Sequence, residues 1–331
     1  MRSVGTPRPT VSAFFDDWFR PRCSTRKGDG LITDVDKRKL LPHQTAQVLI
    51  GSTAGTPPVE VFRTDEMIIE APNWTLDARW LILNGDGKLW RLAADGSSGL
   101  ELIELDVPDL NNDHVLSPDG RHVFVSANDW HIYEADLDGG AVRRITNDGP
   151  EPSMHFLHGV SPDGGTLAYI GLEPEGKDWW ARANIFLIPT AGGADRRLTD
   201  ESKPFDGCEF TPDGEWIYCN TELFSDIAGH AQIARLRPDG TDLQQLTFDE
   251  QVNWFPHISP DGQQVLFLSF PPGTTGHPPN LPIELKLIRD NDWRSSETLI
   301  QTFGGQGTCN VNSWAPDSTR FAYVSYPVGP D

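Results

Sequence analysis

The chain has 331 residues, with 27 Lys and Arg against 48 Asp and Glu, so its formal net charge is −21. Such a negative field repels a phosphate backbone and an anionic lipid surface, so we expect neither a nucleic acid nor a membrane as a partner. No apolar run approaches the roughly 20 residues of a transmembrane helix. The first 20 residues contain no signal-peptide core, which favours the cytoplasm, although a secreted or periplasmic chain with its signal removed would look the same.

The cysteines indicate no metal or redox motif. No two of them form a C-x-x-C pair. A chain of this length does not depend on disulfides for its stability. We expect reduced, mostly buried thiols at Cys23, Cys208, Cys219 and Cys309.

In chain order, residues 1–43 come first and lie outside the repeated part of the sequence. They are predicted to form an N-terminal extension that is mobile or packed on the rest of the chain, with a lid over a central channel as the alternative. Two strand-like runs follow, at residues 46–51 and 59–63.

From residue 75 onwards, one turn motif recurs six times at intervals of 42 to 56 residues. It reads S-P-D-G at 117–120, 161–164 and 259–262, T-P-D-G at 211–214, and is degenerate at 75–78 and 315–318. Proline fixes φ, aspartate bonds its own backbone and glycine takes a positive φ, so each copy is a tight turn. The flanking runs are rich in Val, Ile, Phe, Tyr and Trp, and several repeats end in R-R-I-T or R-R-L-T, at 143–146 and 196–199.

Four strands in every 40–50 residues are typical of a β-propeller, so the sequence predicts an all-β, six-bladed propeller of four-stranded antiparallel blades over residues 44–331. Only one strand-like run follows the last turn motif. The runs at 46–51 and 59–63 are therefore expected to complete the last blade, so that N-terminal strands close the ring by pairing with the C-terminal blade.

The turn motif, the D-L-D-G-G turn at 136–140 and the R-R-L-T endings resemble the TolB-like β-propeller family over about residues 44–326. The chain is more distantly similar to oligogalacturonate lyases, which are propellers with a histidine-rich metal site. The first resemblance implies a non-catalytic scaffold that binds a peptide or a partner protein. The second implies a carbohydrate lyase.

Function in a propeller usually lies where the innermost strands surround the central channel, and each innermost strand should precede a turn motif. Four of the nine histidines fall in these short stretches. A long Gly/Pro-rich loop at 271–282 and a glycine-rich segment at 303–312 could reach the same place. Trp179 and Trp180 form an aromatic tip that could stack on a sugar ring or a partner protein.

Imidazoles that converge on one channel mouth suit a divalent cation of unknown identity, and we expect its ligands among His155, His257 and His277. His257 and His158 are the predicted catalytic residues. Substrate contacts are predicted for Asn112, His114, Trp254, Asn280, Gln306, Asn310 and Asn312. Two interpretations remain open: a metal-assisted lyase on a uronate or keto-sugar type oligosaccharide, and a protein- or peptide-binding scaffold.

Overall fold

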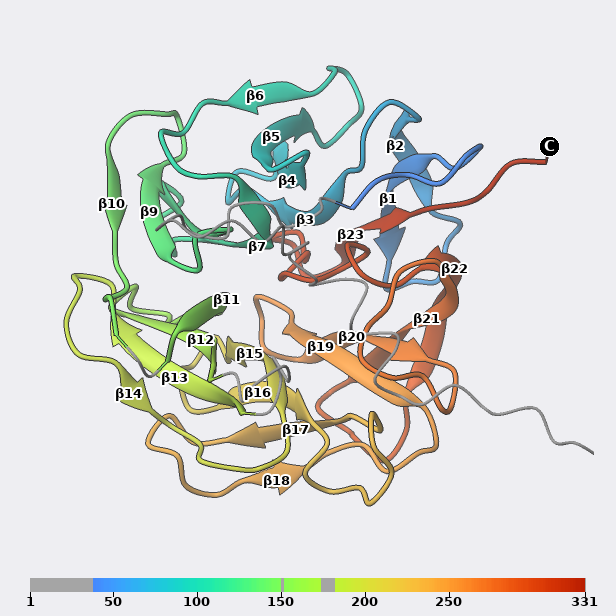
Figure 1. Ribbon diagram of the computed structural model, residues 1–331. Coiled ribbons are helices and arrows are strands. Elements are labelled where there is room, and N and C mark those ends of the chain that lie inside the picture. Colours follow the sequence, from blue (N-terminus) through green and yellow to red (C-terminus); the bar gives the residue numbers. More distant parts are fainter. Residues whose placement is uncertain (1–37, 150–151, 174–181, 331) are drawn as a thin grey trace, which may run out of the picture. The chain divides into compact units, whose positions relative to one another are not determined.

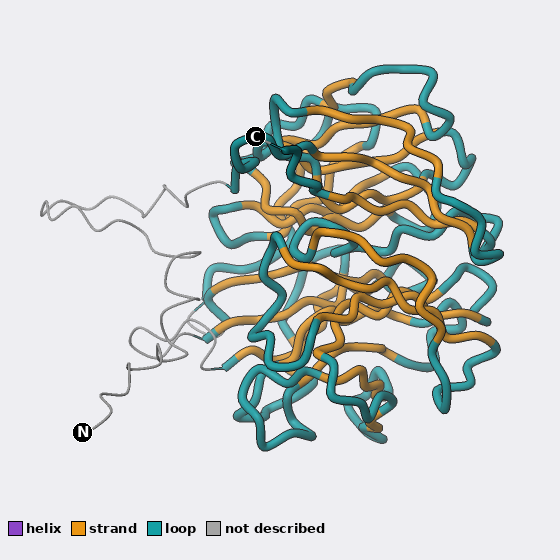
Figure 2. Tube along the Cα trace, turned by 90° about the vertical axis from the view of Figure 1, so that its right-hand side faces the viewer, coloured by secondary structure: helices purple, strands orange, loops and turns teal. Residues whose placement is uncertain are grey.

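The computed structural model describes residues 38–149, 152–173 and 182–330. In these ranges, 23 strands form six antiparallel sheets that are arranged as the blades of a ring (Figure 1). From the side, the strands run between two faces that are covered by turns and loops (Figure 2). The predicted all-β six-bladed propeller is confirmed. The described ranges contain no helix that is long and apolar enough to cross a membrane.

Five sheets each contain four consecutive strands, with the first of the four innermost. The first is β3 (Glu70–Trp74), β4 (Trp80–Gly85), β5 (Lys88–Ala93) and β6 (Glu101–Ile103). The second is β7 (Leu110–Leu116), β8 (His122–Ala127), β9 (Ile132–Asp136) and β10 (Val142–Arg144). The third is β11 (Met154–Val160), β12 (Thr166–Leu172), β13 (Ala183–Pro189) and β14 (Arg196–Arg197). The fourth is β15 (Phe205–Phe210), β16 (Ile217–Thr221), β17 (Gln232–Leu236) and β18 (Gln244–Gln245). The fifth is β19 (Val252–Ile258), β20 (Gln264–Phe270), β21 (Leu281–Arg289) and β22 (Glu297–Gly304).

The sixth sheet closes the ring, as predicted. It has the order β2-β1-β23, with β1 (Ala46–Ser52), β2 (Val59–Thr64) and β23 (Arg320–Ser325). β1 pairs with β23 over six residue pairs from Gln47↔Ser325 to Ser52↔Arg320. The innermost position is held by a single bridge, Trp314↔Phe321, because the glycine-rich segment before it forms turns. The predicted extension 1–43 lies almost wholly outside the described residues and stays a prediction.

The turn motifs have the structural role that the sequence indicates. In the second blade, the Ser117 hydroxyl donates to Asp119 Oδ1 at 2.6 Å and accepts the His122 amide at 2.9 Å, while Gly120 takes a φ of 69°. The same short contact joins the first and third motif residues at Thr75, Ser161, Thr211 and Ser259. The motif aspartates in these five copies are therefore held by turn hydrogen bonds.

The core consists of clusters that join neighbouring blades. Phe205 and Cys208 of β15, for example, pack with Ile170 and Ile185 of the blade before. Cys208, Cys219 and Cys309 are free and buried, as expected, and Cys23 lies outside the described residues.

All five innermost strands share one irregularity that positions their polar side chains. The register of each shifts near the middle, as between Trp254 and His257 in β19 and between Asp206 and Glu209 in β15. Three residues at these shifts, Ala71, Gly207 and Phe255, have φ between 52° and 61°. Because a bulge inserts an extra residue, it changes which side chains share a face of the strand.

Candidate functional site

One carboxylate on an innermost strand lies between two imidazoles from other blades. Asp206 Oδ1 lies 2.8 Å from His158 Nε2, and Asp206 Oδ2 lies 3.7 Å from His277 Nε2. The Gly207 amide also donates to Asp206 Oδ1 at 2.8 Å. Both Asp206 and His158 are buried. We call Asp113, His158, Asp206 and His277 the Asp206 cluster.

The two imidazoles of this cluster differ in their protonation. Burial favours the neutral form of His158, but the Asp206 carboxylate outweighs it and raises the pKa of His158. The pKa of Asp206 is lowered because His158 overcomes the opposing effect of burial. For His277 burial prevails and lowers the pKa. His158 therefore carries the proton of the pair, and His277 is neutral with a lone pair.

Asp113 adds a carboxyl group that titrates near neutrality. It is 5% exposed, and its Oδ2 accepts one hydrogen bond, from Asn111 at 3.0 Å. Burial raises the pKa of Asp113 to about 7, with Asp206 and Glu70 adding to the effect and His158 opposing it. The innermost strands of the first four blades thus share one electrostatic network.

Two glycines fix the β20–β21 loop that carries His277. A Cβ on Gly305, which has a φ of +114°, would lie 2.0 Å from the Pro278 carbonyl oxygen. On the other side, a Cβ on Gly229 would lie 3.0 Å from Thr275 Cα. Only glycine permits such close backbone approach, so the loop is packed between neighbouring segments.

Aromatic side chains surround His277, and two polar atoms beside them lack partners. The His277 ring centroid lies 4.4 Å from that of Trp254 and 5.0 Å from that of Phe255. His277 Nδ1 and Trp254 Nε1 are buried and make no hydrogen bond. Buried polar atoms are usually paired, so one acceptor and one donor are left for a ligand or water.

A second group, the Glu209 cluster, consists of Glu209, His257, Cys309 and Asn312. His257 Nδ1 lies 2.8 Å from Glu209 Oε2, and Nε2 lies 3.0 Å from the Cys309 carbonyl oxygen. Both partners are acceptors, so both ring nitrogens donate. Burial lowers the pKa of His257, but Cys309 and Glu209 raise it overall. His257 has no lone pair free for a metal or for a substrate proton.

Asn312 completes this second cluster. Its Nδ2 donates to Glu209 Oε1 at 2.7 Å and to the Ile258 carbonyl at 2.9 Å. The Ile258 amide donates to the same carboxylate, at 2.9 Å. These contacts join three blades and give the polar groups of Glu209 and of the Asn312 amide nitrogen hydrogen-bond partners.

The other predicted residues lie in three places. His155 is apart from both clusters: its Nδ1 contacts the Trp130 carbonyl at 2.6 Å, and its ring stacks on His131 at 5.6 Å. His114 Nδ1 contacts Asn84 Oδ1 at 2.5 Å, and burial lowers the pKa of His114 to about 3. Asn112 is buried beside Asp113 in β7.

The remaining predicted contacts cluster around the His277 loop. Gln306 raises the pKa of His277 through a hydrogen bond, and Asn310 Nδ2 donates to Gln306 Oε1 at 3.1 Å. Asn280 Oδ1 accepts from Gln44 Nε2 at 2.7 Å. The structure therefore brings together His158, His277, Trp254 and Gln306 from the predicted set.

The residues that the structure describes do not fit a metal site. No group of three or more His, Cys, Asp or Glu side chains among them is arranged to hold an ion. The predicted ligands His155, His257 and His277 lie in separate surroundings, and both ring nitrogens of His257 donate to acceptors.

The carboxylates Asp113, Asp206 and Glu209 were not among the predicted site residues. A signal was present, because each stands in the same stretch before a turn motif as the predicted histidines. Their pairing with particular imidazoles depends on contacts between blades, which a single sequence does not show.

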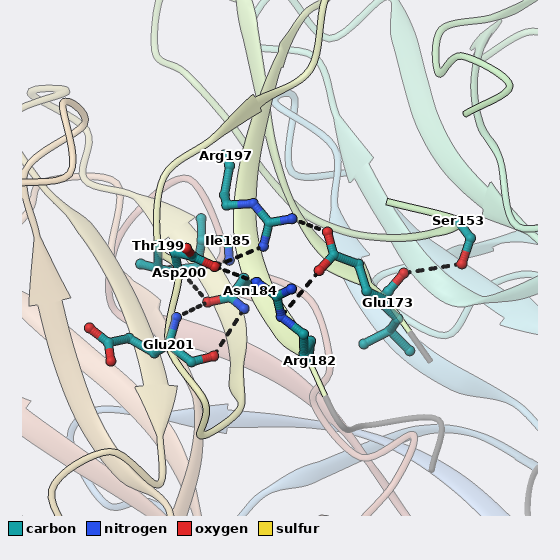
Figure 3. A network of polar contacts seen from close by, with 10 residues as sticks. Ser153, Glu173, Arg182, Asn184, Ile185, Arg197, Thr199, Asp200 and Glu201 are labelled. Carbon is teal, nitrogen blue, oxygen red and sulfur yellow. Dashed lines mark hydrogen bonds and ion pairs between the residues drawn. The ribbon is translucent and has the colours of Figure 1, made fainter. Parts of the chain in front are cut away.

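A separate network stabilises the third blade (Figure 3). Glu173, at the end of β12, forms ion pairs with Arg182 and Arg197, and Asp200 contacts both arginines. Asn184 Oδ1 accepts from the Thr199 hydroxyl at 2.8 Å. The network joins β12, β13 and β14 and has a structural role. Trp179 and Trp180 of the predicted aromatic tip lie outside the described residues.

No family model matches the sequence. An uncharacterised protein of Agrobacterium fabrum is 37% identical over 271 residues, which are 80% of this chain and 87% of that protein. The solved structure of a TolB-like protein from Agrobacterium tumefaciens is 33% identical, with a TM-score of 0.77 over 87% of this chain and 99% of that chain. An oligogalacturonate lyase solved in complex with manganese is 12% identical, with a TM-score of 0.52 over 80% and 75% of the two chains, so this likeness concerns the fold alone. The chain belongs to the TolB-like family of six-bladed β-propellers.

Proposed function

We propose that this chain is a carbohydrate-active enzyme that removes a proton from a neutral keto-sugar, with His277 as the base. The observation that carries the proposal is the Asp206 carboxylate between His158 and His277, where it faces His277 Nε2 while His277 Nδ1 is buried and makes no hydrogen bond. A lowered pKa keeps this imidazole neutral at pH 7, as a general base requires.

The chemistry is a β-elimination. The proton on the carbon beside the sugar carbonyl passes to His277 Nδ1, the electron pair of that C–H bond becomes the double bond to the carbonyl carbon, and the π pair of the carbonyl moves onto its oxygen. The enolate then re-forms the carbonyl while the neighbouring double bond forms and the substituent at the β carbon leaves, taking the proton from His277. The Trp254 indole N–H is a donor for the enolate oxygen.

The charges favour a keto-sugar over a uronate. Asp206 and Glu209 stand on β15 and Asp113 stands on β7, two blades before it, and the imidazolium groups of His158 and His257 are already paired with Asp206 and Glu209. A substrate carboxylate would meet like charges in a partly desolvated place. The imidazolium of His158 neutralises the charge of Asp206. Gln306 and Asn310 lie beside His277 and are the proposed contacts for substrate hydroxyl groups.

The divalent metal of the sequence-based hypothesis has no place in this mechanism, because the described donor groups do not fit one. The cytoplasm stays the predicted compartment.

The test is turnover of a panel of keto-sugars and uronates, followed by ultraviolet absorbance of the unsaturated product, with and without a chelator. His277→Ala should lower kcat at least about 100-fold, the lower range for a general base. His122→Ala, at a partly exposed histidine on β8, is the matched control. An unchanged rate in His277→Ala, or loss of activity with the chelator, would contradict the proposal.

A second function is favoured by the relative with a TM-score of 0.77, which is TolB-like. We propose as the alternative a scaffold that binds a peptide at the same innermost strands. If no sugar in the panel gives product and an immobilised peptide library yields a ligand whose binding is lost in His277→Ala, the scaffold replaces the enzyme.

A further inference from the structure

A groove with a volume of about 340 Å³ lies beside the loop that carries His277, outside both clusters. Pro271 and Pro272 at the start of the loop and Pro282 just after its end form part of its wall. Gln301 of β22 and Gln251, which precedes β19, also line it. Its volume lies near the lower end of the roughly 300–1,000 Å³ of small-molecule sites.

A row of side chains across the fifth blade forms part of the groove. Ser269 pairs with Glu284, and Glu284 pairs with Gln301, so the three side chains share one face of the sheet. Glu284 accepts hydrogen bonds from Thr298 Oγ1 and Gln301 Nε2, each at 3.0 Å, and lies 3.8 Å from Lys286 Nζ. These contacts satisfy the carboxylate, yet its charge would still repel an anion.

The groove retains hydrogen-bonding capacity for a ligand. The Gln251 side chain makes no hydrogen bond within the described part of the chain, and Gln301 uses only its Nε2 group, towards Glu284. Amide groups that both donate and accept suit sugar hydroxyls, and the proline rings offer an apolar surface for the C–H face of a sugar ring.

We propose that this groove is a second subsite, which binds the neutral sugar unit next to the unit processed at His277. The inference rests on the proposed function. One segment supplies both places, since Pro271, Pro272 and Pro282 line the groove and His277 lies between them in the sequence. The loop packs so closely against Gly229 and Gly305 that a Cβ at either position would meet its backbone. The substrate class is therefore a neutral oligosaccharide of at least two units with a keto-sugar at the reacting position.

The experiment measures binding by calorimetry with fructose and with maltulose, a neutral disaccharide that contains the same keto unit. The wild type should bind maltulose about tenfold more tightly, as two additional hydrogen bonds allow. The double variant Gln251→Ala/Gln301→Ala should lose this difference and still bind fructose as the wild type does. Gln263→Ala, at an exposed glutamine beyond the groove, should change neither affinity. Digalacturonate should bind more weakly than maltulose.

The possible failures are distinguishable. Equal affinity for both neutral sugars, or a tenfold preference that survives in the double variant, overturns the subsite and leaves the proton-transfer proposal standing. Maltulose preference without turnover supports the subsite and contradicts the enzyme. If neither neutral sugar binds, both proposals fail.

Discussion

At the scale of single residues, the pair of Asp206 and His158 makes stability depend on pH. The pKa of His158 is raised, so its stabilisation is complete below the ordinary value of 6.5 and is lost as the pH rises through the folded value. The pKa of Asp206 is lowered, so its stabilisation is present above 3.8 and is lost as the pH falls through the folded value. The contribution of the pair is therefore largest between these ordinary values.

Asp206→Asn should consequently lower the free energy of unfolding by about 3–5 kcal/mol near pH 5.5, because it leaves a buried imidazolium without its partner. The loss should be smaller at pH 9, because a smaller fraction of His158 is protonated there than at pH 5.5. Urea unfolding of the wild type and the variant, followed by tryptophan fluorescence at pH 5.5 and at pH 9, measures the loss of unfolding free energy at each pH. The exposed Asp226→Asn is the control. An equal loss at both pH values would contradict the assigned charges.

Asp113 should show the opposite behaviour. Its pKa is about 7 in the folded protein against an ordinary 3.8, so folding takes up a proton between these values and stability falls as the pH rises. Asp113→Asn removes the free-energy cost of ionising this buried carboxyl group. The variant should match the wild type at pH 4 and exceed its free energy of unfolding by a few kcal/mol at pH 8, since each pKa unit corresponds to about 1.4 kcal/mol. Destabilisation at pH 8 would show that the carboxylate is needed.

At the scale of elements, the loop between β20 and β21 depends on Gly305. In Gly305→Ala the new Cβ would meet the Pro278 carbonyl oxygen, so the loop has to move away from the glycine-rich segment. We expect a loss of more than about 1 kcal/mol of stability and weaker ligand binding at His277. Gly99→Ala is the matched control, because nothing lies within 4 Å of its Cβ position and its φ is not positive. Thermal melting and maltulose affinity of both variants provide the check.

The elements also show how far the sequence allowed the site to be predicted. The turn motifs and the strand order followed from local chemistry, because Ser, Asp and Gly act within a few residues of each other. His155 and His158 are three positions apart on β11, and the register shift between Leu157 and Gly159 falls at His158. His257 lies after a bulge in β19 that contains Pro256, a residue type that strands accept mainly at edges and bulges. The contact of Asp206 with His277 crosses 71 positions and depends on how two blades pack.

At the scale of the whole molecule, the ring depends on strands from opposite ends of the described chain. Counting strand-like runs predicted this closure, because an incomplete last blade and two spare runs had only one arrangement without a long open edge. Beyond the β1–β23 ladder, Gln44 pairs with Val328 through a β-bridge, and its side chain donates to the Tyr326 carbonyl at 2.8 Å. The same side chain contacts Asn280 of the loop that carries His277, so Gln44 contributes both to the closure of the ring and to the position of that loop.

Removing the closing strands should therefore damage both stability and binding. A chain that starts at Asp65 lacks β1 and β2, leaves β23 as an open edge and loses the Gln44 contact with Asn280. It should melt well below a matched chain that starts at Arg38, which keeps both strands, and it should associate through the exposed edge in size-exclusion chromatography. Adding a synthetic peptide of residues 44–64 should restore the melting temperature and maltulose binding together, because the peptide supplies the missing ladder and the Gln44 amide. Equal melting temperatures of the two truncated chains would show that the ring does not need its closing strands.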